Sequence, residues 1–146
     1  MITTIILLGN HIQGLGVSRI CHKLGLSVHL FNEDQLCVTR FSSSCNEFTQ
    51  FKGTGGLLKK LLELDVSPHE AVLMPTNDRF VGFMADYYDE LGAKYHLSIP
   101  APDITDICYN KIKTYTIARE MGIPIPESWF PSSEEDIIEL KDQITY

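Results

Sequence analysis

Positive charge and long apolar runs are both scarce in this sequence, and each shortage excludes a class of partner. Its 146 residues include 12 Lys and Arg against 19 Asp and Glu, a formal net charge of -7. A negative field repels phosphate backbones and anionic lipids, so we expect neither nucleic acid nor a membrane surface as a partner. The apolar run at residues 2–8 has no basic residue before it and is too short for a signal peptide core or a membrane span, which favours a buried strand.

Motifs for metal binding and covalent catalysis are also missing. The four cysteines include no C-x-x-C pair, and the five histidines show no H-x-x-x-H spacing. We therefore expect no metal site in this chain, and reduced thiols in a cytoplasmic protein. No serine lies in a G-x-S-x-G turn and no cysteine has an evident base partner, so covalent hydrolase chemistry has no support.

Apolar runs do alternate with helical patterns over the first hundred residues. The expected strands are 3–8, 26–31, 48–51 and 70–75, and the expected helices are 15–24, 57–65 and one long helix from about 77 to 92. A continuously apolar, β-branched run is typical of a strand covered on both faces, as in a parallel sheet. The alternation predicts an α/β fold with a Rossmann-like, doubly wound and mainly parallel sheet.

The organisation changes after the two prolines of "SIPAPD". Helical patterns near 103–109 and 111–121 lead to Gly122, and "IPIPESWF" follows as an extended piece. Ser132 and Glu135 have the spacing of a capping box for a last helix. We place the domain boundary between residues 102 and 103, and we interpret the closing "ITY" as the beginning of a strand.

A glycine loop follows the first strand, in the stretch "IILLGNHIQGLGVSR" at residues 5–19. Gly9 and Gly14 have the spacing of a Walker A loop, but Leu15 and Gly16 stand where that loop needs Lys and Ser or Thr. The P-loop interpretation therefore fails on its chemistry.

A dinucleotide fingerprint fits the same loop in part. Gly14 and Gly16 supply two of the three glycines of G-x-G-x-x-G, and Arg19 replaces the third. Glu33 or Asp34 lies near the end of the second strand, where an acid that binds ribose is found in such proteins. A stand-alone module that binds NAD(P) or another nucleotide is one interpretation, and glycines that only permit a tight turn are another.

Other candidate contacts are fewer. His11 is the one histidine within the glycine loop, where it contacts a ligand or is simply solvated. Asn77 and Asp78 follow the strand that ends at Pro75, at the edge where open α/β sheets bind ligands, although helix capping explains them equally well. The segment "KGTGG" at 52–56 is an anion site at a helix start or a flexible connector.

Four stretches together resemble the N-terminal region of ATP-grasp enzymes, in particular the carbamoyl-phosphate-synthase-like and D-aspartate-ligase-like carboxylate–amine ligases. They are "LLGNHIQGLGVSRICHKLGLSV", "VLMPTNDRFV", "YNKIKTYTIAREMGIPIPES" and "SSEEDIIELKDQITY". The third is the most specific, because in that superfamily a lysine that opens a helix, followed by A-x-x-x-G-I-P-x-P, marks the entry into the ATP-grasp domain.

The resemblance implies a pre-ATP-grasp Rossmann-like domain at 1–102 and the first helices of a truncated ATP-grasp domain at 103–146. Lys111 matches the lysine that contacts ATP phosphates, with Asn110 where an aspartate is frequent. The rest of the ATP site and the acids that bind Mg²⁺ would follow Tyr146. The resemblance therefore places no catalytic residue in this chain and implies that residues 1–146 alone are inactive.

The activity implied for the parent protein is the ATP- and Mg²⁺-dependent activation of a small-molecule carboxylate, which an amine then attacks. In that case the glycine loop and the end of the fourth strand would contact the substrate. The expected substrate-binding residues are Asn10, His11, Gln13, Gly14, Gly16, Asn77 and Asp78. The resemblance also allows a homo-oligomer.

Overall fold

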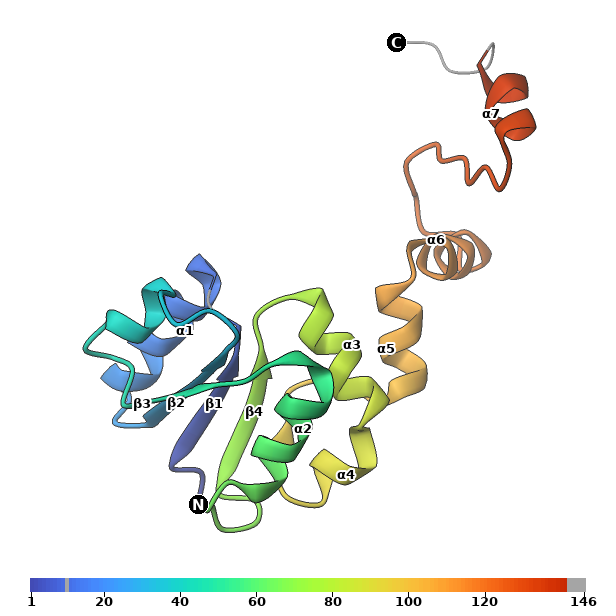
Figure 1. Ribbon diagram of the computed structural model, residues 1–146. Helices are drawn as coiled ribbons and strands as arrows, with labels where there is room; N and C mark the ends of the chain where they lie inside the picture. Colours follow the sequence, from blue (N-terminus) through green and yellow to red (C-terminus); the bar gives the residue numbers. More distant parts are fainter. Residues whose placement is uncertain (10, 142–146) are drawn as a thin grey trace. The chain divides into compact units, whose positions relative to one another are not determined.

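The computed structural model describes residues 1–9 and 11–141 (Figure 1). Its contacts divide the chain into two units, residues 1–106 and residues 107–146. Asn10 and the "ITY" segment, for which we expected a ligand contact and a starting strand, lie outside the described residues.

The first unit is built on a five-stranded sheet in the order β3-β2-β1-β4-β5. The strands are β1 (Thr4–Leu8), β2 (Ser27–Asn32), β3 (Glu47–Gln50), β4 (Ala71–Pro75) and β5 (His96–Leu97). Every pairing is parallel, and β1 at the centre pairs with both β2 and β4. The predicted α/β fold with a parallel sheet is confirmed.

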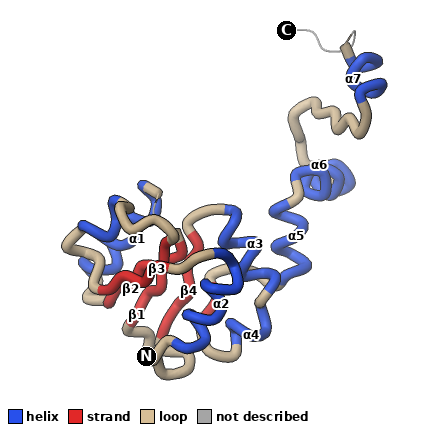
Figure 2. Tube along the Cα trace, viewed as in Figure 1, coloured by secondary structure: helices blue, strands red, loops and turns tan. Residues whose placement is uncertain are grey.

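Helices cover both faces of this sheet, as the doubly wound prediction requires (Figure 2). The elements are α1 (Ile12–Lys23), the 3-10 helix η1 (Val38–Phe41), α2 (Gly53–Glu63), α3 (Asp78–Asp86) and α4 (Tyr88–Gly92). The next helix, α5 (Pro102–Tyr109), runs across the division between the two units. One apolar cluster lies between the sheet and α1 with the η1 segment, and a second lies between the sheet and α2, α3 and α4.

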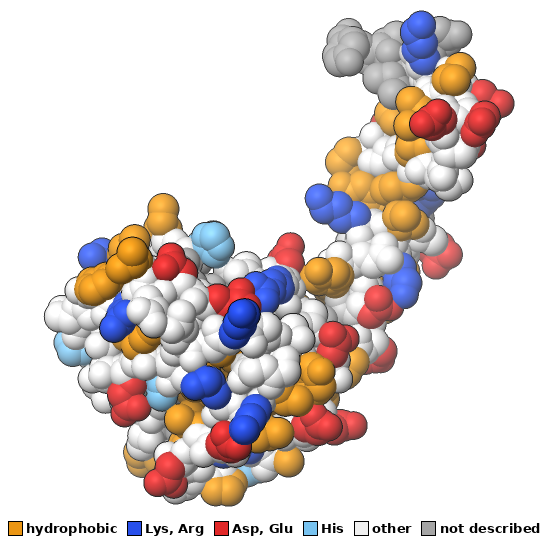
Figure 3. Space-filling model, in the orientation of Figure 1, with side chains coloured by type: hydrophobic (Ala, Val, Ile, Leu, Met, Phe, Trp, Pro, Cys, Tyr) orange, Lys and Arg blue, Asp and Glu red, His pale blue; other side chains and the backbone are white. Residues whose placement is uncertain are grey.

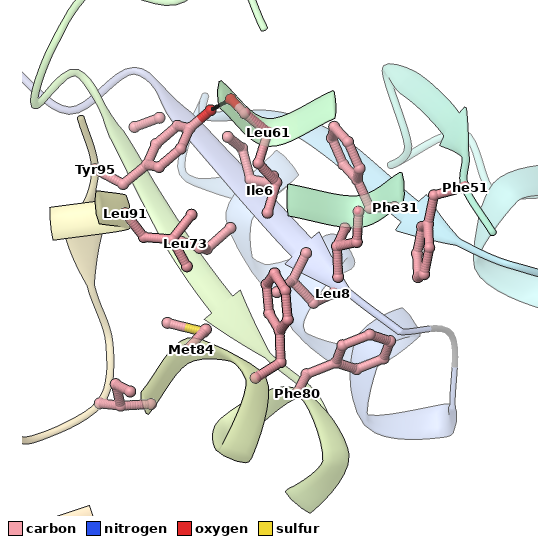
Figure 4. Close-up of a cluster of buried hydrophobic side chains, with 14 residues drawn as sticks. Ile6, Leu8, Phe31, Phe51, Leu61, Leu73, Phe80, Met84, Leu91 and Tyr95 are labelled. Atoms are coloured by element: carbon pink, nitrogen blue, oxygen red, sulfur yellow. Dashed lines mark hydrogen bonds between the residues drawn. The ribbon is translucent and has the colours of Figure 1, made fainter. Parts of the chain in front are cut away.

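The central strand shows why its sequence is apolar without a break. Ile5 and Leu7 belong to the cluster on the α1 face, whereas Ile6 and Leu8 belong to the cluster on the α2 face. Because successive side chains of a strand point to opposite faces, a strand covered on both sides needs apolar residues at every position. Figure 4 shows Ile6 and Leu8 among the side chains of the second cluster.

Tyr95 is the polar member of that second cluster. Its ring is 1% exposed, and its hydroxyl donates a hydrogen bond to the carbonyl oxygen of Leu61, the dashed contact in Figure 4. Burial raises the pKa of Tyr95 to about 12. The hydroxyl thus joins the end of α2 to the residue that precedes β5 without placing a charge in the core.

Three local expectations were wrong, and one strand was missed. The helix expected over 15–24 is α1, which begins at Ile12, so Gly14 and Gly16 lie in the helix and not in the loop before it. The segment "KGTGG" is no connector: α2 begins at Gly53, because burial of Leu57 and Leu61 against the sheet outweighs the low helix propensity of glycine. The single helix expected over 77–92 is two helices that meet at Tyr87, whose φ of -117 and ψ of 32 are not helical. The two-residue strand β5 was not expected, since two residues are too few to show the alternation of apolar and polar side chains that identifies a strand.

The second unit contains α6 (Lys111–Glu120) and α7 (Glu134–Leu140), and neither helix buries a side chain completely. Gly122, with φ of 70, follows α6 as expected. The capping box of α7 is formed by Ser133 and Asp136, one residue later than the pair predicted. Whether this unit begins an ATP-grasp domain stays a prediction.

Candidate functional site

The candidate site lies where β1 and β4 end side by side in the centre of the sheet. The helix that follows β1 packs on one face, and the helix that follows β4 packs on the other. Such a point of divergence leaves a crevice at the carboxyl ends of the strands, which is where open α/β sheets bind ligands. The glycine loop and the "PTND" segment, separated by some sixty residues of sequence, meet at this point.

Gly9 ends β1 in a backbone conformation that other residues rarely adopt, with φ of 98. A Cβ atom here would lie 2.4 Å from Thr76 Oγ1 and 2.9 Å from the ring of Phe80. Thr76 Oγ1 in turn donates a 2.8 Å hydrogen bond to the carbonyl oxygen of Leu8. Gly9 therefore lets the ends of β1 and β4 approach closely, and Thr76 ties them together.

Gly14 and Gly16, both within α1, have different surroundings. Gly14 is buried, and a Cβ there would lie 3.2 Å from the carbonyl oxygen of Gly9 and 3.4 Å from Thr76 Cγ2. Gly16 has nothing within 4 Å of a Cβ position. Gly14 thus brings the first turn of α1 against the strand ends, whereas Gly16 leaves an open surface.

The N-terminus of α1 is the electropositive part of the site. His11 is its N-cap but makes no side-chain capping hydrogen bond, and no acidic residue lies in the first turn. The first N–H groups of a helix have no partner within the helix, and they carry the positive end of its dipole. Such a terminus at a strand end is suited to binding an anion.

The structure assigns clear positions to the other predicted contacts. His11 and Gln13 are exposed at the start of α1. Asn77 caps α3, since its Oδ1 accepts a 3.2 Å hydrogen bond from the backbone nitrogen of Phe80, and Asp78 is exposed in the first turn of that helix. Sequence reasoning missed Thr76, which carries no signal beyond its place after an apolar strand.

Glu33 is already engaged at the end of β2. Its carboxylate accepts hydrogen bonds from Arg79 Nη1 at 2.7 Å and Nη2 at 3.1 Å, and from the backbone nitrogen of Gly53 at 3.0 Å. The hydrogen bonds from Arg79 are the main reason that the pKa of Glu33 is lowered. A carboxylate held in this way has little capacity left for ribose hydroxyls, which weakens the dinucleotide interpretation.

A cavity of about 240 Å³ opens beside the start of α1, lined by His11, Ile12, Leu15 and Val38. A cavity of about 520 Å³ lies at the ends of β2 and β3 beside α2, and one of about 630 Å³ lies at the opposite edge of the sheet near His96, the first residue of β5. Of these three, the small apolar cavity adjoins the turn that faces the strand ends.

In the second unit, Lys111 is the first residue of α6 and is exposed. Asn110 caps this helix: its Oδ1 accepts hydrogen bonds from the backbone nitrogens of Ile112 at 3.0 Å and Lys113 at 3.3 Å. Asparagine therefore performs the capping that an aspartate would perform here, and the departure from the common pattern leaves the helix start intact.

Within 1–9 and 11–141, no three or more His, Cys, Asp and Glu side chains come together in a way that could hold a metal ion. Over the same part of the chain, none of the helices has the length and hydropathy needed to cross a bilayer.

Comparison with known proteins gives a match in structure but none in sequence. No protein-family profile and no curated protein matches the chain. N5-carboxyaminoimidazole synthetase from Staphylococcus aureus, solved with ADP, is 15% identical with a TM-score of 0.73, over 99% of this chain and 36% of that one. The biotin carboxylase domain of a thermophilic 2-oxoglutarate carboxylase, bound to bicarbonate, is 13% identical with a TM-score of 0.66, over 100% and 34%.

Pyruvate carboxylase from Rhizobium etli is 17% identical with a TM-score of 0.66, over 92% of this chain and 14% of that one. The fold is that of the N-terminal region of ATP-grasp ligases. The resemblance found in the sequence is thus confirmed as a likeness of fold. The chain spans only about a third of the length of the synthetase and the biotin carboxylase domain.

Proposed function

We propose that residues 1–146 are the N-terminal, substrate-binding portion of an ATP-dependent ligase, which activates a carboxylate as an acylphosphate for attack by an amine. The observation that carries the proposal is the start of α1, which lacks a side-chain cap and an acidic first turn. It packs against the carboxyl ends of β1 and β4, where the helices that follow these two strands go to opposite faces of the sheet. The match over nearly the whole chain to structures that contain ADP or bicarbonate supports the same chemistry.

In this proposal the first turn of α1 holds the substrate carboxylate. The N–H groups around Gly14 point toward it and offset its charge, while His11 and Gln13 supply side-chain donors at the rim. Gly16 leaves space for the ligand beside the helix, and Asn77 and Asp78 border the site from α3. Fixed donors orient one carboxylate oxygen for phosphoryl transfer and cost no reorganisation during the reaction.

The reaction consists of two transfers. The carboxylate oxygen attacks the terminal phosphorus of ATP and releases ADP; the amine nitrogen then attacks the acyl carbon and releases phosphate. Lys111, an exposed cation at a helix start, would hold the ATP phosphates, since only an anion removes its conflict with the helix dipole. Mg²⁺ supplies charge neutralisation on the phosphoryl group in such reactions, but the described residues offer no cluster for it, and we derive no step through it.

The proposal also covers the location and the partners of the protein. We expect a cytoplasmic protein that acts on small molecules and that can form a homo-oligomer. We expect residues 1–146 alone to be inactive. The alternative, a stand-alone module for NAD(P) or another nucleotide, is weakened by Arg19 in place of the third glycine and by the engagement of Glu33.

Trapping of the acylphosphate tests the proposal. Hydroxylamine converts an acylphosphate into a hydroxamate and phosphate, so the ligase that contains residues 1–146 should form hydroxamate only when ATP and its carboxylic acid are both present. Residues 1–146 alone should form none above background. Hydroxamate that forms without ATP, or turnover by the 146-residue chain, would contradict the proposal.

A further inference from the structure

The cavity beside α1 bears on the kind of acid that this site accepts. We infer that the substrate carboxylic acid carries a compact apolar substituent, either a branched aliphatic chain or a single ring, and that this group occupies the cavity between α1 and η1. The inference rests on the proposed function, because it assumes that the carboxylate is bound at the first turn of α1.

Among the residues that the structure describes, the lining of the cavity is aliphatic except for one imidazole. Ile12 and Leu15 come from α1, Val38 comes from η1, and His11 is the polar member. None of these described lining residues is a lysine, an arginine or an acid, so a phosphorylated or otherwise charged substituent would find no partner ion among them. An apolar group would instead remove aliphatic surface from water.

Two of the lining side chains are unusually accessible. Ile12 is 88% exposed and Val38 is 67% exposed, although both are aliphatic. Hydrophobic side chains gather over the start of α1 and over η1 in the space-filling view (Figure 3). Gathered apolar surface of this kind is a common sign of a ligand or partner site.

One residue joins this surface to the carboxylate site. Ile12 is the first residue of α1, so its backbone N–H belongs to the electropositive terminus while its side chain lines the cavity. A carboxylate on the N–H groups therefore places its substituent beside Ile12. The positive end of the helix dipole would bind the carboxylate, and the aliphatic lining of the cavity would contact the apolar substituent of the acid.

The size of the cavity limits the substituent. A dry apolar cavity of about 150 Å³ is enough for one benzene molecule. The observed volume of about 240 Å³ holds a single ring or a branched chain with little excess. Acids without a substituent, such as bicarbonate or acetate, would leave it unfilled.

Nuclear magnetic resonance titration of the 146-residue chain tests this inference. The backbone amide signals of 12–15 are followed while acetate, isovalerate or phenylacetate is added. Each buried methylene group lowers a Kd by about fourfold. The three extra carbons of isovalerate should therefore lower its Kd by about tenfold to sixtyfold relative to that of acetate. Phenylacetate should likewise bind more tightly than acetate.

Matched variants locate the effect. Val38→Trp fills the cavity from an exposed position, so the Kd of isovalerate should rise to that of acetate while the Kd of acetate is unchanged. Leu36→Trp makes the same change two residues away, at a side chain that is 78% exposed and outside the lining, and should leave both Kd values unchanged. Thermal unfolding of each variant confirms that the fold is retained.

The outcomes separate the inference from the proposed function. Equal Kd values for all three acids would overturn the inference alone, as would tight binding of isovalerate by Val38→Trp. Failure of every acid, acetate included, to shift the signals would overturn both. Shifts at Val38 that depend on protein concentration without any acid would assign the surface to a second copy of the chain and overturn the inference.

Discussion

Replacing Gly9 with alanine is expected to lower the free energy of unfolding by about 3 kcal/mol, roughly a hundredfold in the folding equilibrium. Two costs combine. The φ of 98 is unfavourable for any residue with a Cβ, and that Cβ would lie 2.4 Å from Thr76 Oγ1. Relief of the clash requires the side chains of Thr76 and Phe80 to move, which breaks the hydrogen bond from the Thr76 hydroxyl to the carbonyl oxygen of Leu8.

Urea denaturation of the chain measures this effect, and Gly16→Ala is its control. Gly16 lies within α1, close to Gly9 in the sequence, but its Cβ position is open and its φ is not positive. Alanine there should stabilise the helix by about 0.5–1 kcal/mol. If both variants unfold alike, the close approach of β1 and β4 is not what requires Gly9.

Replacing Lys111 with methionine is expected to reduce kcat/KM for ATP by about a hundredfold in the ligase that contains this chain, because a charge-assisted contact to phosphate is lost. Methionine keeps the length and helix propensity of the side chain, so the loss should come from the charge. Lys111 opens α6 and is exposed. Initial rates over a range of ATP concentrations measure the effect.

Lys113→Met is the matched control for this experiment, because it removes the same charge from the same helix two residues later. It should change kcat/KM for ATP by less than a few-fold. An ATP dependence that is the same in both variants would show that the helix start does not hold the phosphates.

The layout of the sheet could be read from the sequence because its physical cause is local. β1, β2 and β4 are apolar runs bounded by glycine, proline or acidic turns, and burial on both faces demands that pattern. The start of α2 could not be read, since glycines normally end a helix and only the packing of Leu57 and Leu61 shows that they begin one. Such packing depends on the tertiary fold rather than on the local sequence.

The candidate site could be predicted only in part, for the same reason. The glycine loop and Asn77 can be recognised as sequence patterns, and the structure places Gly9 beside Thr76 and Asn77 at the ends of β1 and β4. The sequence could not show that Gly14 is packed while Gly16 is open. Nor could it show that Arg79 donates hydrogen bonds to the carboxylate of Glu33, because these two residues are far apart in the sequence and only the fold brings them together.

A titration of the 146-residue chain with acetate and with NAD⁺, followed at the backbone amides, tests the central claim most directly. That claim is that the start of α1, at the carboxyl ends of β1 and β4, binds a carboxylate. We predict that acetate shifts the amide signals of 12–15 and that NAD⁺ at millimolar concentration does not. Micromolar binding of NAD⁺ that is lost when Gly14 or Gly16 is replaced, with no response to acetate, would contradict it.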